Sequence, residues 1–430
     1  MSEEGDQGDN RRGRTWGPAV LKNRNFARLF FAGVTSASGF AIGQVALTWI
    51  VFSTTKSALD VAYIGVSFVA ASVIFSLAAG ALVDRHERRK LMVLSDLARA
   101  ASLAVLVVYL LVIGFSLPVI LGVAFVLGSF TTLFQPAERA LTPEVVGSEQ
   151  LANANALVQS SNSVIQFASN GVAGVLVGVA GVITAFSLNA LTFIVSALLI
   201  LGIVGFAVPK RPTAGADGGP HPSVMADLRE GFGYIARNRA LLELTVSAGL
   251  ANFFLVMALQ FFVVYAQSVL QGGPVVFGFI GGSFALGFAP GAYLSARLRT
   301  VRFAGWTYII SGVADGICIA GLVALPYLVT ALVFAFMIGL FLGLLNTTWL
   351  TTVQLIVPTE MQGRYFGLDQ LGSFAVIPVG QVLGGVVIST MGISTDYLIA
   401  ALGAILSTGL FALSGDLRKL KLKETPPISK

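Results

Sequence analysis

The sequence predicts an all-α membrane protein in which twelve transmembrane helices form two pseudo-symmetric bundles of six helices each. Three observations support this fold class. Hydrophobic residues make up 55% of the 430 residues and charged residues only 11%, with a mean hydropathy of +0.83, whereas an average chain carries roughly 25% charged residues. The apolar residues gather in twelve long runs, and the two halves of the chain share a weak internal repeat.

Each apolar run is long enough to cross a membrane as a helix, because ~20 residues span the ~30 Å hydrocarbon layer. Charged residues, proline or glycine separate consecutive runs. The first six runs are 26–52, 59–83, 91–114, 117–136, 150–180 and 183–207. The other six are 241–269, 275–296, 303–325, 328–350, 366–390 and 395–414.

The basic residues predict how these helices are oriented. With the N-terminus inside the cell, all but one of the 27 Lys and Arg residues fall on the cytoplasmic side or at cytoplasmic helix ends, and only Lys56 lies outside. A missed or additional helix would invert every later loop and scramble this asymmetry. We therefore expect a multi-pass protein of the cell (inner) membrane with both termini in the cytoplasm.

Polar segments divide the chain into regions. The start of the chain is polar and Gly-rich and shows no apolar core followed by a cleavage site, which predicts a disordered cytoplasmic tail. After the sixth run, a Pro/Gly-rich stretch precedes Val224, Leu228, Phe232 and Ile235 at helical spacing, which predicts a linker with an amphipathic helix. The predicted regions are the tail 1–20, the N-terminal bundle 21–208, the cytoplasmic linker 209–240, the C-terminal bundle 241–415 and a second cytoplasmic tail 416–430.

Two short segments recur in both halves. GALVDR at 80–85 aligns with GAYLSA at 291–296, and LTPEVV at 141–146 resembles IVPTEM at 356–361. Parallel duplication of a six-helix unit is known from membrane transporters.

Three sequence motifs resemble a known family. The loop after the second run reads GALVDRHERRKLMVLSD and resembles the signature loop of the major facilitator superfamily. FQPAERALTPEVVGSEQLANANALVQS at 134–160 and ADLREGFGYIARNRAL at 226–241 look like its drug exporter branch, which includes macrolide efflux and enterobactin export proteins. The resemblance spans roughly residues 17 to 415. It implies the major facilitator fold and alternating-access export of a small amphipathic molecule of drug, macrolide or siderophore type.

The signature loop also implies a conformational latch, because in this superfamily it holds the two halves together on the cytoplasmic side. Glycine permits close helix approach, and an aspartate accepts bonds from a helix N-terminus or an arginine. The implied latch residues are Gly80, Asp84, Arg85, Arg88, Arg89 and Asp96. The alternatives are that the basic residues, with Lys90, only determine topology, and that Asp96 and Arg99, one turn apart, only neutralise each other.

Departures from the family pattern leave proton antiport open. Glu87 stands where the signature usually has glycine, the fourth run lacks a buried arginine, and no proline accompanies the glycines of the fifth run. Ionisable groups inside a membrane cost roughly 2.5 to 3.5 kcal/mol, so each is a functional candidate. The coupling candidates are Asp315, in the ninth run, and Asp369, early in the eleventh. A neutral Asp315 bonded to Ser311 or to a backbone carbonyl is the alternative.

Amide side chains provide the candidates for substrate binding. Asn155, Gln159, Asn162, Gln166 and Asn170 recur every three to four residues along the fifth run and form a polar stripe. Lipid would leave these amides unpaired, so the stripe faces either a water-filled path or neighbouring helices. The substrate-contact candidates are Gln44, Gln159, Asn162, Gln166, Asn252, Gln260, Asn346 and Gln354. The nearby aromatic residues expected to form an apolar wall are Phe253, Phe254, Phe261, Phe262 and Trp349.

Several other classes of protein are excluded or disfavoured. An ATP-driven pump needs a GxxxxGKS or GxxxxGKT loop, which the sequence lacks, and the short loops and tandem repeat disfavour a channel. The only histidines, His86 and His221, lie in predicted cytoplasmic segments, and Cys318 is the only cysteine. We therefore expect no enzyme, no metal site, no cofactor and no nucleic-acid partner, but a monomer that contacts its substrate and membrane lipids, with protons left open. A lipid or lysolipid flippase of the same fold and a non-transporting receptor or scaffold remain as alternatives.

Overall fold

The computed structural model describes residues 17–147, 150–204, 232–233, 239–297 and 303–413, and the regular structure of these residues is entirely helical. The first half contains a short 3₁₀ turn, η1 (Gly17–Lys22), and then α1 (Arg24–Thr55), α2 (Ala58–Arg85), α3 (Arg88–Val112), α4 (Leu117–Val146) and α5 (Leu151–Leu201). The second half contains α7 (Arg239–Leu259), α8 (Phe262–Val264), a π-helical turn η2 (Tyr265–Val269), α9 (Pro274–Arg297), α10 (Ala304–Ala324), α11 (Leu328–Ile356), α12 (Thr359–Met391) and α13 (Ile393–Leu413).

The helices of the described residues give twelve membrane-spanning segments. Nine are long and apolar enough to cross a membrane, and α12 and α13 carry shorter apolar stretches. The twelfth segment comes from α5, which bends at Gly181, where φ is 82° and ψ is 169°, and thereby divides into two arms. Only glycine adopts such a backbone conformation without strain. The predicted all-α fold with twelve spans is confirmed.

The helices extend beyond the apolar runs that predict them. α4 continues to Val146, although the predicted run ends at 136, and α12 begins at Thr359 rather than at 366. Hydropathy detects the lipid-embedded part of a helix, whereas the helix itself continues into polar residues. Pro136 lies inside α4 without ending it, so the sequence around it belongs to the bundle and not to a loop.

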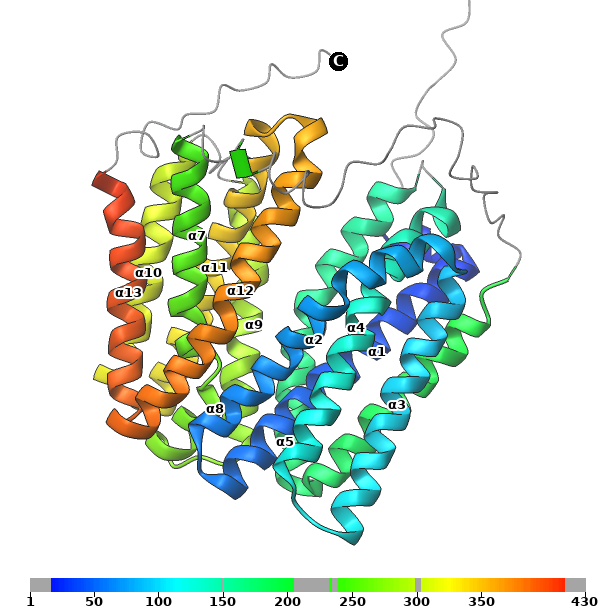
Figure 1. Cartoon of the computed structure of the whole chain (residues 1–430), viewed down its shortest axis with the longest axis horizontal. Coiled ribbons are helices and arrows are strands. Elements are labelled where there is room, and N and C mark those ends of the chain that lie inside the picture. The colour runs from blue at the N-terminus through cyan, green and yellow to red at the C-terminus, as the bar shows by residue number, and fades with distance from the viewer. Residues whose placement is uncertain (1–16, 148–149, 205–231, 234–238, 298–302, 414–430) are drawn as a thin grey trace, which may run out of the picture.

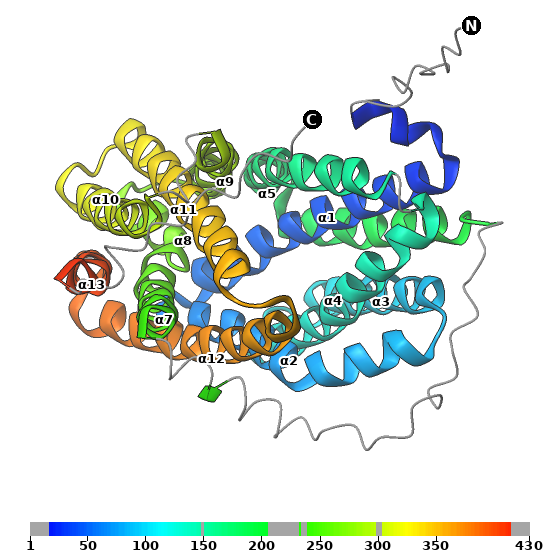
Figure 2. The same cartoon turned by 90° about the horizontal axis from the view of Figure 1, so that it is seen from above.

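The two halves have the same internal packing (Figures 1 and 2). In the first half α2 packs on α4, and α3 packs on both α4 and α5. In the second half α9 packs on α11, and α10 packs on both α11 and α13. Helices that follow each other in the same order therefore make equivalent contacts, which is the pseudo-symmetry that the internal repeat predicts. The recurring GALVDR and GAYLSA segments lie at equivalent places, the last turns of α2 and α9.

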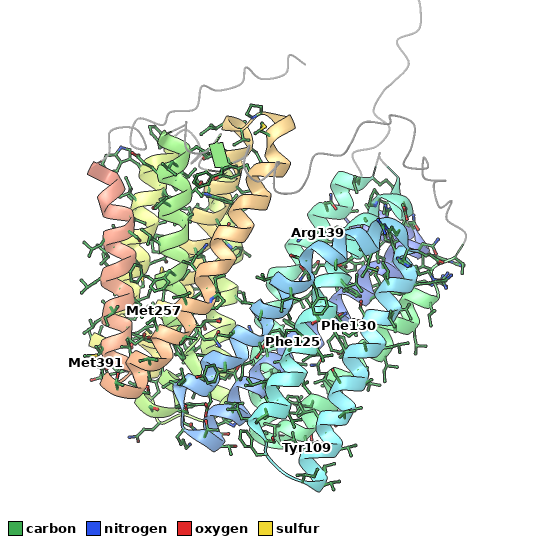
Figure 3. All side chains as sticks on the ribbon, viewed as in Figure 1. Tyr109, Phe125, Phe130, Arg139, Met257 and Met391 are labelled. Atoms are coloured by element: carbon green, nitrogen blue, oxygen red, sulfur yellow. The ribbon has the colours of Figure 1, made fainter. Side chains whose placement is uncertain are left out.

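The two ends of the molecule differ. At one end, here called the linker end, α1 and α7 begin and α5 and α13 finish; the other is called the opposite end and holds the turns after α1 and α12. The halves lie against each other near the opposite end and diverge toward the linker end (Figure 1). Arg139 marks the linker-end part of α4, whereas Tyr109 and Met391 lie near the opposite end (Figure 3).

The predicted region boundaries stay a prediction. The tail 1–20, the linker 209–240 and the tail 416–430 fall mostly or wholly outside the described residues, as do Val224, Leu228 and Ile235 of the predicted amphipathic helix.

Candidate functional site between the two halves

Two helix pairs join the halves, α5 with α9 and α2 with α12. In the first pair the helices meet through glycine: a Cβ added at Gly278 would lie 2.6 Å from the carbonyl oxygen of Asn170 and 2.7 Å from the Cα of Gly174. In the second pair a Cβ at Gly385 would lie 3.0 Å from the Cα of Leu59. Such close backbone approach is how membrane helices associate through van der Waals contact. Both seams lie near the opposite end.

Polar side chains reinforce the α2–α12 seam. Gln260 Nε2 donates to the carbonyl oxygen of Val61 on α2 at 3.3 Å, and Gln381 Nε2 on α12 donates to Gln260 Oε1 at 3.3 Å. Lys56 Nζ donates to Gln267 Oε1 across the halves at 3.1 Å. These bonds close the opposite end of the molecule in this conformation.

The seventh span is broken at this closure. Its regular helix α7 ends at Leu259, and the short helix α8 and the π-helical turn η2 complete the span. Broken helices and π-turns in membrane proteins leave backbone groups and side chains available at functional sites. Gln260, predicted as a substrate contact, sits directly at the break and bonds between the halves.

The other substrate-contact candidates are scattered. Gln44 and Asn252 are half-buried, whereas Asn346 and Gln354 are exposed on α11. The structure places Gln159, Asn162, Gln166 and the coupling candidate Asp369 on helices, and their side chains lie outside what it describes. Of the polar stripe, Asn155 is exposed and Asn170 packs against Gly281 of α9. Asn170 of the stripe thus contacts a neighbouring helix. That the stripe faces a water-filled path stays a prediction.

Three aromatic residues predicted to form the wall of a substrate path pack inside the second half instead. Phe254 lies against Gly403 of α13, Phe261 lies against Gly384 and is fully buried, and Phe262 is buried beside Phe284. Phe254 lies on the regular helix α7, and Phe261 and Phe262 follow its end at Leu259, so these three rings contribute to the packing of their own half.

The basic residues of the signature loop bind the first half. Arg88 pairs with Glu144 of α4 and donates from Nη1 to the carbonyl oxygen of Ala140 at 2.8 Å. Arg89 Nη2 donates to the carbonyl oxygen of Leu201, at the end of α5, at 2.6 Å. Cations at helix C-termini satisfy carbonyl groups that have no partner in the helix and complement its dipole.

The remaining latch residues make no contact with the second half in the described structure. Arg85 is exposed, a Cβ at Gly80 would meet open space, and the side chain of Asp84 lies outside what the structure describes. The halves diverge toward the linker end (Figure 1), so a latch that joins them there stays a prediction.

Asp96, also predicted as a latch residue, lies inside the first bundle. Arg99 Nη2 bonds Asp96 Oδ1 at 2.5 Å, and both side chains are almost completely buried. The guanidinium of Arg99 lies 4.3 Å from the ring centre of Phe193 and 4.6 Å from that of Phe134. Stacking between two rings and pairing with a carboxylate fix this arginine in place.

Glu138 of α4 completes this charge cluster. Its carboxyl group lies within electrostatic reach of Arg139, Arg99 and Asp96, and Arg139 acts on it more strongly than the other two. A Cβ at Gly33 of α1 would lie 2.6 Å from a carboxyl oxygen of Glu138, so the glycine makes room for this side chain. Glu138 is not among the predicted site residues, because the fourth apolar run ends at Pro136. Its place within a family-like motif, two residues after the proline, was the available signal.

Asp315 lies in a seam within the second half. It is 4% exposed, and its Oδ1 has no hydrogen-bond partner among the described residues. Gly312 and Gly316, beside it on α10, pack against Thr408 and Ile405 of α13. The predicted bond between Ser311 and Asp315 is absent in the described structure, because Ser311 Oγ also has no partner there.

The described residues contain no cluster of three or more His, Cys, Asp or Glu side chains that could hold a metal ion. The candidate site therefore consists of the two seams between the halves, and the buried Asp96–Arg99 pair with Glu138 nearby lies inside the first half.

The sequence matches the model of a family described as transmembrane secretion effector over residues 14–429. The chain belongs to this family of the major facilitator superfamily. The multidrug efflux pump Tap of Mycolicibacterium fortuitum is 25% identical over 411 residues, which cover 93% of this chain and 97% of that protein. Macrolide efflux protein A of Streptococcus pyogenes is 25% identical over 386 residues, which cover 89% and 94%.

Solved structures of other transporters share the fold of this chain. The nucleoside transporter NupG matches with a TM-score of 0.71 and 13% identity over 90% of this chain and 98% of that one. A bacterial homologue of the iron transporter ferroportin, solved in an inward-facing state, matches with a TM-score of 0.69 and 14% identity, covering 90% and 98%. The predicted membership of this chain in the major facilitator superfamily and its drug exporter branch is confirmed.

Proposed function

We propose that this protein is a secondary active exporter of small amphipathic molecules that works by alternating access. The observation that carries the proposal is the asymmetric contact between the halves: glycine seams and hydrogen bonds join them near the opposite end, while the halves diverge toward the linker end (Figure 1). Relatives that match along nearly their whole length are named as multidrug and macrolide efflux pumps, which supports export and the chemical class of the cargo.

The distribution of charge supports an orientation in which the linker end faces the cytoplasm. The described basic residues near that end are Lys22, Arg24, Arg28, Arg85, Arg88, Arg89, Lys90, Arg139, Arg239, Arg297 and Arg364, whereas Lys56 lies at the opposite end. Cytoplasmic loops carry the excess of Lys and Arg in membrane proteins. The structure then corresponds to an inward-open conformation of an inner-membrane protein with both termini in the cytoplasm.

In this orientation the transport cycle has a simple geometry. Substrate enters from the cytoplasm or inner leaflet between the diverging halves, and the exposed Asn346 and Gln354 of α11 are its predicted contacts. Rocking of the bundles then closes the linker end and separates the seams at the opposite end. The bond from Gln260 to the carbonyl oxygen of Val61 must break in that step, because it joins the two halves. No cofactor takes part, and a monomer contains the complete path.

The test is transport by purified protein in liposomes. Erythromycin, enterobactin and a fluorescent lysolipid are each offered with and without an imposed pH gradient, and protein-free liposomes are the control. Accumulation of erythromycin or enterobactin against its gradient supports the exporter. Movement of lysolipid alone identifies a flippase, and binding without movement identifies a receptor or scaffold; either result overturns the proposal.

A further inference from the structure

The broken seventh span meets a buried carboxyl group at the opposite end of the second half. We propose that Asp396 of α13 and the backbone at the break form a binding site for one sodium ion, and that the bound ion favours the conformation in which the opposite end is closed. Binding of the ion is independent of the cargo, whereas its effect on the halves rests on the alternating access proposed above.

The carboxyl group of Asp396 lacks a partner of opposite charge. Its side chain is completely buried, and both carboxyl oxygens have no hydrogen-bond partner among the described residues. None of the ion pairs formed by the described residues includes Asp396. A buried carboxylate without a partner is strongly unfavourable inside a membrane. The group therefore needs a ligand that supplies positive charge.

The place of Asp396 in its helix favours a cation over a proton as that ligand. Asp396 lies in the first turn of α13, where the positive end of the helix dipole stabilises a carboxylate. Protonation would discard this stabilisation and add a buried O–H donor that needs an acceptor. A monovalent cation neutralises the carboxylate completely, whereas a divalent ion would leave a net positive charge.

The backbone of the seventh span supplies a further oxygen ligand. In a continuous helix the amide of Phe261 would donate to the carbonyl oxygen of Met257, but at the break it donates to that of Ala258 at 3.3 Å. Met257 is buried and lies on the part of α7 nearer the opposite end (Figure 3), so its carbonyl oxygen loses the donor of the regular helix away from solvent. Interrupted helices of transporters coordinate Na⁺ through such carbonyl oxygens.

Gly384 of α12 brings the carboxyl group and the break together. A Cβ at this position would lie 3.2 Å from Asp396 Oδ1 and 3.5 Å from the Cα of Met257. The same Cβ would lie 2.6 Å from the ring of Phe261. The carboxyl oxygen and the backbone of the break thus surround one point, and the absence of a side chain at Gly384 permits this approach.

The chemistry of the site suits sodium. Hard cations prefer oxygen ligands, and carboxylate and carbonyl groups offer only oxygen. The site needs no cluster of acidic side chains, because backbone carbonyl oxygens complete the coordination of a monovalent ion. A cavity of about 90 Å³, lined by the exposed Ser394 and by the buried Tyr397, lies beside Asp396 in the chain and has room for water. We expect the ion to approach from this side.

The site lies next to the contacts that join the halves. Gln260, at the break, donates to the carbonyl oxygen of Val61 in the first half. Gly385, the residue after Gly384, packs on Leu59 of the first half. An ion that joins α13 to the break fixes the arrangement that presents both contacts. Because a ligand shifts an equilibrium toward the conformation that binds it more tightly, sodium favours the closed opposite end.

The first test measures the binding of radioactive sodium by the full chain in lipid nanodiscs, at constant pH and with choline chloride keeping the ionic strength constant. The wild type is expected to bind one sodium ion per molecule with saturation. Asp396→Asn is expected to weaken this binding by at least about tenfold, because it removes the only charged ligand. The amide has nearly the same volume and avoids a buried charge, so the variant is expected to elute as a single folded species.

Two other carboxyl groups provide the controls. Asp60 also lies in the first turn of a helix at the opposite end, α2, but is only half-buried, and Asp315 is a second buried carboxyl group of the same half. Asp60→Asn and Asp315→Asn are both expected to bind sodium as the wild type does. No saturable binding by the wild type, equal binding by Asp396→Asn, or a loss in Asp315→Asn instead overturns the sodium site.

The second test measures the effect of sodium on the conformation without any substrate. Spin labels at Leu82→Cys on α2 and Arg297→Cys on α9, exposed positions of different halves, are introduced in a Cys318→Ala background. Pulsed electron resonance gives the distance between them. Sodium in place of choline is expected to raise the population of the long distance, and an affinity difference of about tenfold between conformations changes their ratio about tenfold at saturation.

Asp396→Asn is expected to show the same distances in sodium and in choline. A distance that ignores sodium in a wild type that binds it overturns the effect of the ion on the halves. The transport assay gives a separate answer. If none of the three probes crosses liposomes but sodium binds through Asp396, the sodium site stands and the exporter fails. If a probe is exported but sodium does not bind, the exporter stands and the sodium site fails.

Discussion

Three buried carboxyl groups of this protein, those of Asp96, Asp315 and Asp396, have different surroundings, and we therefore expect them to have different roles. Asp96 pairs with Arg99 within a cluster that contains a second acid. Asp315 and Asp396 are each buried with at least one oxygen that has no hydrogen-bond partner among the described residues. Asp396 lies in the first turn of α13, where the helix dipole favours a negative charge, whereas Asp315 lies midway along α10 without such support.

The position of Asp315 predicts a modest effect on transport. Its helix α10 packs on α11 and α13 of its own half, so rocking between the halves does not need to change its surroundings. We expect Asp315→Asn to retain pH-gradient-driven export in liposomes within about twofold, because the amide has nearly the same volume and avoids a buried charge. Complete loss of gradient-driven export, with exchange of substrate across the membrane retained, would instead make Asp315 the coupling residue.

At the scale of helices, hydropathy and charge predict most of the structure. The runs 26–52 and 59–83 correspond closely to α1 and α2, because a lipid-facing helix must be apolar along its length. The end of α4 could not be predicted in the same way, because Pro136 normally signals the end of a helix. Glu138 lies just beyond that predicted end and was therefore not among the candidate residues. The faces of Phe261 and Phe262 were also unpredictable, because the regular helix is interrupted between Leu259 and Phe262, which changes the direction of the side chains that follow.

The seam between α5 and α9 allows a matched test of how closely the halves must approach. We expect Gly278→Ala to shift the protein away from the linker-end-open conformation, because its Cβ would lie 2.6 Å from the backbone oxygen of Asn170. Overpacking of this kind costs about 1–3 kcal/mol, which corresponds to a change of about 5- to 150-fold in the ratio of conformations. The distance between spin labels at Leu82→Cys on α2 and Arg297→Cys on α9, two exposed positions of different halves, reports the shift when measured by pulsed electron resonance in a Cys318→Ala background.

Gly281→Ala is the control for this substitution on the same helix. Its Cβ would lie 3.8 Å from the Asn170 side chain, an ordinary van der Waals contact, so the conformational ratio is expected to stay at the wild-type value. Equal behaviour of the two variants would show that the close approach at Gly278 does not govern the equilibrium.

For the whole molecule, the sequence predicts two equivalent halves but not the conformation in which they meet. The repeat at 80–85 and 291–296 indicates the duplication, since equivalent segments fold alike. The choice between the two open states depends on small differences between seams, such as the bonds of Gln260 and the glycine contact at Gly278. Such differences of a few kcal/mol between packed states are not visible in hydropathy or charge patterns.

If the two ends of the molecule open in turn, a covalent bond between the halves at the opposite end is expected to stop transport. Lys56 and Gln267 lie on different halves, and their side chains meet at 3.1 Å. We expect Lys56→Cys with Gln267→Cys, in a Cys318→Ala background, to join under mild oxidation or through a short bifunctional thiol reagent. The joined protein is expected to lose export of the probe that the wild type transports by at least about tenfold, because the seams cannot separate, and to recover it once the disulfide is reduced.

Each single cysteine variant, treated in the same way, controls for modification of one side chain and is expected to retain export. The label distance at the linker end gives the reason for any loss: the joined protein is expected to remain at the long distance. The bundles move as rigid bodies, and one end closes only when the other opens. Undiminished export by fully joined protein would contradict alternating access through this end, and would require a path within one bundle instead of between the two.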